Sequence, residues 1–172
     1  PGDRAIKLLA DDGQRGDRFG RFVAASGDVI VVGAHLANGL DLRTGAVYTY
    51  DRDSPFWIQT AKLIPTDGDL GDAFGWPVAI DGDTLVVGAW GDDDLGSDSG
   101  SVYVFERVGD AWMQTTKLLA PDGESSDRFG RALAIDNDTL VIGARYDDDR
   151  GLDAGSAYVY QRVNGSWFFV DK

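Results

Sequence analysis

The side chains best suited to chemistry are aspartates, which gather in two segments rich in glycine, aspartate and serine. Each segment carries a run of three aspartates and a fourth aspartate four residues later. Ca²⁺ is bound by clusters of carboxylate and carbonyl oxygens on loop backbone, so calcium is the cofactor that these segments suggest. An alternative is that the aspartates cap turns by accepting hydrogen bonds from loop N–H groups. The candidate metal ligands are Asp92, Asp94, Asp98, Asp147, Asp149 and Asp153.

A second set of candidates is aromatic and basic. Three tryptophans, Trp57, Trp112 and Trp167, recur at intervals of 55 residues and are interpreted as packing residues. Trp76 and Trp90 do not recur. Arginine or histidine stands at the matching positions, which indicates a surface released from packing. Trp90 is suited to stacking on a sugar or a partner side chain, and a partly buried loop anchor is the alternative. The candidate ligand-binding residues are Trp76, Trp90, His35 and Arg145.

Catalysis would require an activated nucleophile, an acid/base pair or a metal. The sequence has one histidine, no cysteine and no Gly-x-Ser-x-Gly motif. We therefore predict that the chain is not an enzyme, with a glycan hydrolase built on paired aspartates as the less favoured alternative. The net charge of −13 argues against nucleic acid and anionic lipid as partners. No apolar run is long enough for insertion into a membrane.

These candidate residues sit within an internal repeat of 55 residues, present three times without insertion or deletion. A fixed repeat of this length indicates a modular architecture. The recurring pairs and single residues are Phe19-Gly20, Phe74-Gly75 and Phe129-Gly130; Gly33-Ala34, Gly88-Ala89 and Gly143-Ala144; and Tyr48, Tyr103 and Tyr158.

Each copy has the pattern of four short strands. In the second copy the expected strands are residues 74–80, 84–89, 101–107 and 112–119, and the Asp-Gly pair before residue 84 is typical of a tight hairpin. No segment combines a helical period with helix caps. The fold class is therefore all-β, and a repeated four-stranded antiparallel sheet predicts a β-propeller with three blades. A single β-sandwich is the alternative. The expected single propeller segment covers residues 1–172, with blades at about 19–64, 74–119 and 129–172.

The Phe-Gly pair, the following strand and the Val-Val-Gly-Ala motif that ends at Ala89 resemble the FG-GAP repeat of integrin-α-like propellers. The segments Gly100–Phe105 and Gly155–Tyr160 are similar to the bacterial branch of that family. The resemblance covers essentially the whole chain and implies a secreted or cell-surface bacterial protein. It also implies a calcium loop between the first two strands, but the corresponding turns here, such as residues 81–83, hold too few carboxylates.

Three blades would leave an open ring, because propellers typically have four to eight blades. Two chains would supply six, so we predict a homodimer that closes a six-bladed ring by twofold symmetry. In this arrangement residues 4–10 of one chain complete the outer strand of the third blade of the other. The alternative is a fragment of a longer single-chain propeller.

Strand alternation places the long loops, which hold most of the acid, on one face of the blades. We predict a non-enzymatic module, with a role in cell adhesion among those that the resemblance suggests, that recognises a protein or glycan through this acidic loop face. A structural, self-assembling half-propeller or an excised or engineered fragment without a ligand of its own is the second hypothesis. The tripeptide Arg15-Gly16-Asp17 matches an integrin-ligand sequence, but Asp17 is a repeat position, which favours a structural role.

Overall fold

The computed structural model describes residues 6–172, and all regular elements within that range are β-strands. They form three antiparallel four-stranded sheets in which consecutive strands are neighbours. The all-β prediction and the three propeller blades are therefore confirmed. Blade 1 contains β1 (Phe22–Ser26), β2 (Val29–Ala34), β3 (Ala46–Asp53) and β4 (Phe56–Leu63). Blade 2 contains β5 (Val78–Asp81), β6 (Thr84–Ala89), β7 (Ser101–Val108) and β8 (Ala111–Leu118). Blade 3 contains β9 (Phe129–Asp136), β10 (Thr139–Ala144), β11 (Ser156–Val163) and β12 (Ser166–Asp171).

The tight turns between the first two strands of each blade depend on residues that tolerate positive φ. Gly27, Gly82 and Asn137 have φ values of 55°, 53° and 52°. Glycine and asparagine adopt this left-handed conformation at low cost, and it matches the twist of a two-residue hairpin. The hairpins therefore form where the sequence predicts them. In blade 2, however, β5 begins at Val78 rather than at Phe74. Pro77 has no N–H to donate to a sheet ladder, and β1 likewise begins after its Phe-Gly pair.

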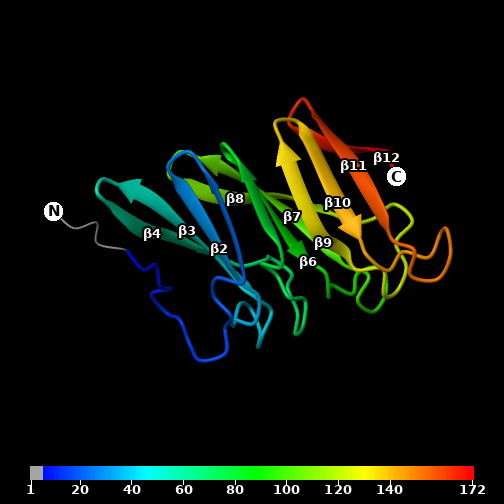
Figure 1. Cartoon of the computed structure of the whole chain (residues 1–172), viewed down its shortest axis with the longest axis horizontal. Helices are drawn as coiled ribbons and strands as arrows, with labels where there is room; N and C mark the ends of the chain where they lie inside the picture. Colours follow the sequence, from blue (N-terminus) through cyan, green and yellow to red (C-terminus); the bar gives the residue numbers. More distant parts are fainter. Residues whose placement is uncertain (1–5) are drawn as a thin grey trace.

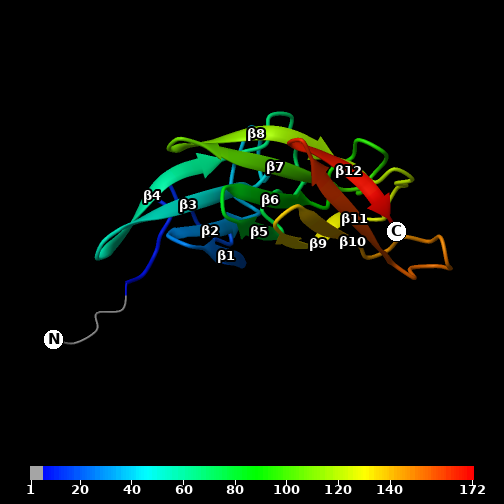
Figure 2. The same cartoon turned by 90° about the horizontal axis from the view of Figure 1, so that it is seen from above.

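The blades are arranged as a fan. Figure 2 shows β1, β5 and β9 along one edge of the fan and β4, β8 and β12 along the opposite edge. The first strands of neighbouring blades contact each other, which defines the inner edge. In Figure 1 the short turns lie at the top, and the longer loops that follow the second and fourth strands lie at the bottom. We call the side of the longer loops the loop face.

Neighbouring blades pack through apolar sheet faces at which glycine permits close approach. The core between blades 1 and 2 joins residues such as Val31 and Val47 to Leu85 and Tyr103. A Cβ atom added at Gly33 would overlap the carbonyl oxygen of Gly75 in the next blade. The interface between blades 2 and 3 repeats this arrangement with Gly88 and Gly130. The repeated glycines thus serve the approach of one blade to the next.

Charged groups join the blades near the short turns. Arg107 of blade 2 bonds to Asp51 of blade 1 through a 2.5 Å contact. Arg162 of blade 3 bonds to Glu106 of blade 2 at 3.2 Å. These arginines are one repeat apart, as are their acidic partners, so the contacts are a regular feature of the interface.

The described part of the N-terminal segment covers the outer face of blade 1. Leu8 and Ala10 pack there, and the carbonyl oxygen of Leu9 accepts a hydrogen bond from the Tyr50 hydroxyl at 2.8 Å. Leu119 and Tyr160 make the same contact in blade 3 at 2.9 Å. Residues 6–10 form no strand. Residues 4 and 5 of the expected shared strand lie outside the described range.

Candidate functional site

The aspartates of blade 2 that were predicted to bind metal surround a lysine. The Nζ atom of Lys117 lies 2.8 Å from Asp92, 2.7 Å from Asp94 and 3.0 Å from Asp67. The Tyr103 hydroxyl is within hydrogen-bond distance of both Asp67 and Asp92. Burial disfavours the charge on Lys117, but its hydrogen bonds to the three carboxylates outweigh this and raise its pKa. The ammonium group thus occupies the centre of the acidic cluster.

Blade 3 repeats this cluster around Lys172. Its Nζ atom contacts Asp122 at 2.8 Å, Asp149 at 2.7 Å and also Asp147. Burial alone would raise the pKa of Asp147, but hydrogen bonds from Lys172, Ser156 and other neighbours lower it to about 2. Asp147 is therefore held in its charged form by groups of the chain itself.

Blade 1 has a reduced version of the cluster. Lys62 contacts Asp12 at 2.6 Å and the carbonyl oxygen of Asn38 at 3.2 Å. Ala37 and Gly39 stand where blade 2 has Asp92 and Asp94. One carboxylate and one carbonyl thus replace the three carboxylates, while the lysine is retained.

The remaining candidate metal ligands, Asp98 and Asp153, lie apart from these clusters. Asp98 adopts a positive φ of 53°, its N–H donates to Asp93 at 2.7 Å, and its carboxylate pairs with Arg128 at 3.3 Å. The N–H of Asp153 makes the equivalent bond to Asp148. In the described range no group of three or more acidic, histidine or cysteine side chains is arranged for a metal ion. The calcium prediction itself stays untested.

Sequence reasoning assigned no role in the acidic clusters to the lysines, although Lys62, Lys117 and Lys172 recur at the repeat interval. The recurrence of these lysines was the available signal. A lysine that recurs at the same interval as the aspartates indicates a structural ion pair as readily as a metal site.

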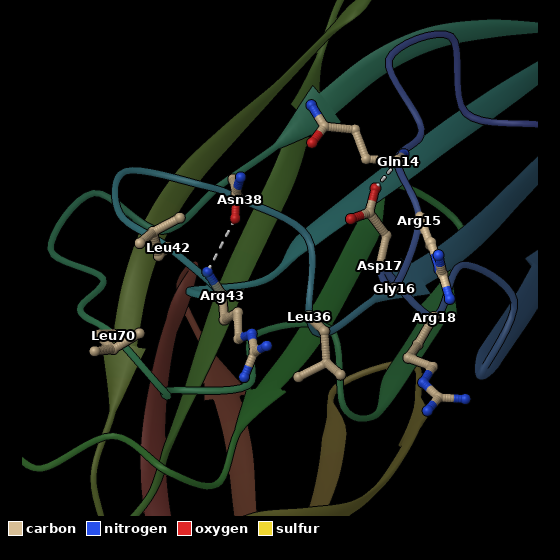
Figure 3. A pocket seen from close by; sticks show the side chains of 10 residues that line it. All are labelled: Gln14, Arg15, Gly16, Asp17, Arg18, Leu36, Asn38, Leu42, Arg43 and Leu70. Carbon is tan, nitrogen blue, oxygen red and sulfur yellow. Dashed lines mark hydrogen bonds between the residues drawn. The ribbon is translucent and has the colours of Figure 1, made fainter.

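A second aspartate in each repeat closes a local turn. The carboxylates of Asp17, Asp72 and Asp127 each accept a hydrogen bond at 2.7 Å from the N–H three residues earlier. Figure 3 shows this bond between Gln14 and Asp17, in the wall of a hollow of about 560 Å³. The Arg15-Gly16-Asp17 tripeptide therefore includes an aspartate with the structural role expected from its repeat position.

At the inner end of the loop face the aromatic and basic candidates come together. Arg21, Trp76 and Arg131 occupy equivalent positions in the three blades, each directly after the Phe-Gly pair. The Cζ atom of Arg131 lies 4.4 Å from the centroid of the Trp76 ring and 5.0 Å from that of Trp90. Arg21 lies 5.0 Å from the Trp76 centroid. Guanidinium groups are attracted to indole faces, so the blades assemble a continuous stack.

The stack extends in both directions. The imidazole of His35 meets Trp76 edge to face, with ring centroids 4.4 Å apart. On the other side Arg128 lies 4.6 Å from Trp90 and 5.0 Å from Tyr146, and Arg145 lies 4.7 Å from Tyr146. We call the set the basic–aromatic ladder; its members are Arg21, His35, Trp76, Trp90, Arg128, Arg131, Arg145 and Tyr146.

The ladder unites the four candidate ligand-binding residues, with Arg145 joined to the others through Tyr146 and Arg128. The sequence did not identify Arg131, which is the central contact between Trp76 and Trp90. Guanidinium groups of the chain lie over both indoles, and the prediction that Trp90 stacks on a sugar or a partner side chain stays untested.

Positive charge and unpartnered donors accumulate in the ladder. His35 is only 6% exposed, and burial together with Arg21, Arg18 and Arg131 lowers its pKa to about 4. Burial, Arg128 and Arg145 also lower the pKa of Arg131. The buried side-chain nitrogens here without a hydrogen-bond partner among the described residues are Nδ1 of His35, Nε1 of Trp90, Nε of Arg128 and Nη1 of Arg131.

A hollow of about 500 Å³ opens beside Arg131 and Arg145, on the side of blade 3 that faces away from blade 2. Its other walls come from the ends of β10 and β11 and include Gly143 and Gly155. The basic end of the ladder is therefore accessible to a ligand.

A family model described as the FG-GAP repeat matches the chain three times, at residues 3–50, 57–105 and 112–160. The three matches together cover most of the chain and follow the internal repeat, which confirms the resemblance stated from the motifs. A comparison with curated proteins gave no match.

Proposed function

Because the chain belongs to the FG-GAP repeat family, whose repeats form propeller-type modules, we propose that it is a non-enzymatic recognition module. Its ligand is a protein or glycan, and the binding surface is the loop face. The predicted setting is secreted or on a bacterial cell surface, where such a module contacts other macromolecules. Calcium is not part of this proposal, because a lysine ammonium group already occupies the centre of each cluster of three carboxylates.

The observation that carries this proposal is the basic–aromatic ladder. Residues that depart from the repeat pattern, Trp76 and Trp90, meet arginines from neighbouring blades at one accessible place. The equivalent positions in the other blades hold arginine or histidine, so packing between blades does not require tryptophan at these two positions. Arg145 is exposed at one end of the ladder, lines the adjoining hollow and forms no salt bridge within residues 6–172, so its guanidinium group is available to a ligand.

The acidic clusters support a role in stability better than one in catalysis. Asp92 and Asp147 are buried and bonded to lysine. Burial raises the pKa of Asp72 to about 6, as a general acid would require. However, the Asp72 carboxylate is 4% exposed and accepts the Asp69 N–H, so it is withdrawn from substrate. These contacts disfavour the glycan hydrolase alternative.

The test is a screen of the labelled chain against arrays of glycans and surface proteins. We expect ligands whose binding is lost in Arg145→Glu, which reverses an exposed charge on the loop face. Arg52→Glu is the matched control, since Arg52 is exposed near the opposite, short turns and pairs only with exposed Asp28 among the described residues. No ligand, or a ligand sensitive to Arg52→Glu alone, would contradict the proposal.

A second candidate function, self-assembly, is favoured by the free face of blade 3. Val141 is 36% exposed there, whereas Val86, one repeat earlier, is fully buried against blade 3. The two valines point to the same side of their respective sheets. Blade 3 therefore exposes the sheet side that blades 1 and 2 bury against the following blade. An exposed apolar sheet face of this kind is suited to association.

The shape of this free face matches the other end of the same chain. A Cβ atom added at Gly45 or Gly100 would overlap the carbonyl oxygen of Phe74 or Phe129 in the following blade. The equivalent Gly155 instead lines the 500 Å³ hollow. Blade 1 of a second copy carries the corresponding Phe19-Gly20 pair, which could fill it. Two such contacts, related by a twofold axis, would close a six-bladed homodimer.

The mass in solution, measured by light scattering at micromolar concentration, tests this second candidate. We expect a dimer for the wild type and a monomer for Val141→Asp. The control is Met113→Asp, which places the same charge at an exposed position on the outer rim of blade 2 and should remain dimeric. A monomeric wild type would rule out self-assembly.

A further inference from the structure

The ladder contrasts with the charge of the rest of the molecule. The chain has a net charge of −13, and three of its four lysines and four of its arginines are paired with carboxylates. In residues 6–172, by contrast, Arg21, Arg131 and Arg145 form no salt bridge. Arg128 of the ladder pairs with Asp98, but the other three arginines of the ladder converge without a counter-charge in that range.

This convergence carries an electrostatic cost that a bound anion would reduce. Like charges close together in a partly buried place repel one another. The effect is visible in the lowered pKa values of His35 and Arg131, to which neighbouring arginines contribute in both cases. A negative charge bound in the hollow lined by Arg131 and Arg145 would offset this repulsion.

We propose that the basic–aromatic ladder binds the side-chain carboxylate of an aspartate or glutamate presented by a protein partner. This inference rests on the proposed recognition function and gives the chemical class of its ligand. The stacked arginines hold planar N–H groups in a fixed orientation, which suits bidentate bonding to a planar carboxylate. The indoles fix the guanidinium groups in place rather than contacting the ligand first.

The surroundings of the ladder favour one carboxylate over a long polyanion. The loops that follow β6 and β10 carry exposed aspartates on the same face, among them Asp93, Asp94, Asp148 and Asp149. An extended sulfated glycan or nucleic acid would have to cross this acidic surface and would be repelled. A single acidic side chain on a protein can reach the arginines without doing so.

The experiment is an NMR titration of the ¹⁵N-labelled chain at constant ionic strength. The probe is N-acetylglutamate α-amide, which has one side-chain carboxylate, and N-acetylglutamine α-amide is its neutral counterpart. The reporters are the indole N–H of Trp90 and the side-chain Nε–H of Arg131. We expect both signals to shift with the acidic probe only, and the pKa of His35 to rise on saturation because a negative charge is added nearby.

Variants locate the contact. Arg131→Gln should weaken binding by about tenfold or more, because a charge-assisted bidentate bond is lost. Arg131→Lys keeps the charge but not the planar fork and should bind with intermediate affinity. Arg150→Gln is the control, an exposed arginine in a loop of the same face, and should change affinity by less than about twofold. The backbone spectrum shows whether each variant is folded.

Equal binding of the acidic and neutral probes, no shift with either, or equal losses in Arg131→Gln and Arg150→Gln would overturn the proposal. So would stronger binding of a chondroitin sulfate tetrasaccharide, which would identify a polyanionic glycan instead. If array ligands still depend on Arg145 while the acidic probe does not bind, recognition stands and only the carboxylate inference fails. If the probe binds and the arrays give no ligand, the site stands without the wider function.

Discussion

Replacing Lys117 by methionine tests whether lysine is the structural cation of the acidic cluster. Methionine keeps most of the aliphatic stem and removes the ammonium group. The Lys117 side chain is 15% exposed and that of Asp92 is 4% exposed, so the change leaves a buried carboxylate without its positive partner. Breaking a buried pair costs about 3–5 kcal/mol. Asp67 and Asp94 are about half exposed and remain hydrated, so we expect the low end of that range, about 3 kcal/mol.

The matched control is Lys62→Met in blade 1. Lys62 bonds to one carboxylate, Asp12, and the two side chains are 30% and 50% exposed. An exposed pair of this kind contributes about 0.2–1 kcal/mol. The melting temperature should therefore fall by about 6–12 °C for Lys117→Met and by about 1–4 °C for Lys62→Met. Equal losses in the two variants would refute the reasoning that the carboxylate trio depends on its lysine.

The same variants test calcium. In the wild type, millimolar calcium and EDTA should give the same melting temperature, because the ammonium group already occupies the cluster. In Lys117→Met the three carboxylates are released, and calcium should recover part of the lost stability. A wild type that is stabilised by calcium would show that the lysines do not replace the metal.

Three further predictions follow from the packing and the charges. The pKa of His35 is about 4 in the folded chain against about 6.5 in the unfolded chain, so the wild type loses stability as pH falls. The difference in unfolding free energy between the wild type and His35→Gln should therefore change by up to about 3 kcal/mol between pH 7 and pH 4. A difference that stays constant in urea unfolding would contradict the lowered pKa. Gly88→Ala should lower the unfolding free energy by about 2–4 kcal/mol, because its Cβ would overlap the Gly130 carbonyl. Gly143→Ala should lower it far less in the monomer. Equal losses of stability would contradict the role of Gly88 in the contact between blades 2 and 3. Arg162→Gln should cost about 1 kcal/mol by removing bonds to Asp138 and Glu106, and the loss should shrink at high salt.

Most of the fold follows from local features of the sequence. The 55-residue interval, the positive-φ turn residues and the apolar strands predicted the three sheets, because each feature is encoded within one repeat. The expected strand 84–89 matches β6 in both bounds. The start of β5 was predicted too early, because the first strands of blades 1 and 2 begin after the Phe-Gly pair, whereas that of blade 3 begins at it.

The candidate site was less accessible to sequence reasoning because it depends on contacts between segments. The aspartates were recognised as a cluster, but the lysine that joins them comes from a strand end about 25 residues away. Trp76 and Trp90 were identified by their departure from the repeat. Their pairing through Arg131 arises only when blade 3 packs on blade 2 and brings equivalent inner positions together.

The claim that the ladder is the ligand site is tested most directly by hydrogen exchange on the chain bound to its partner. We expect slower exchange at residues 20–22, 75–78, 89–91 and 144–146, which lie at the inner end of the loop face. The short turns at Gly27, Gly82 and Asn137 should be unaffected. Protection at those turns, with none in the ladder segments, would contradict the claim.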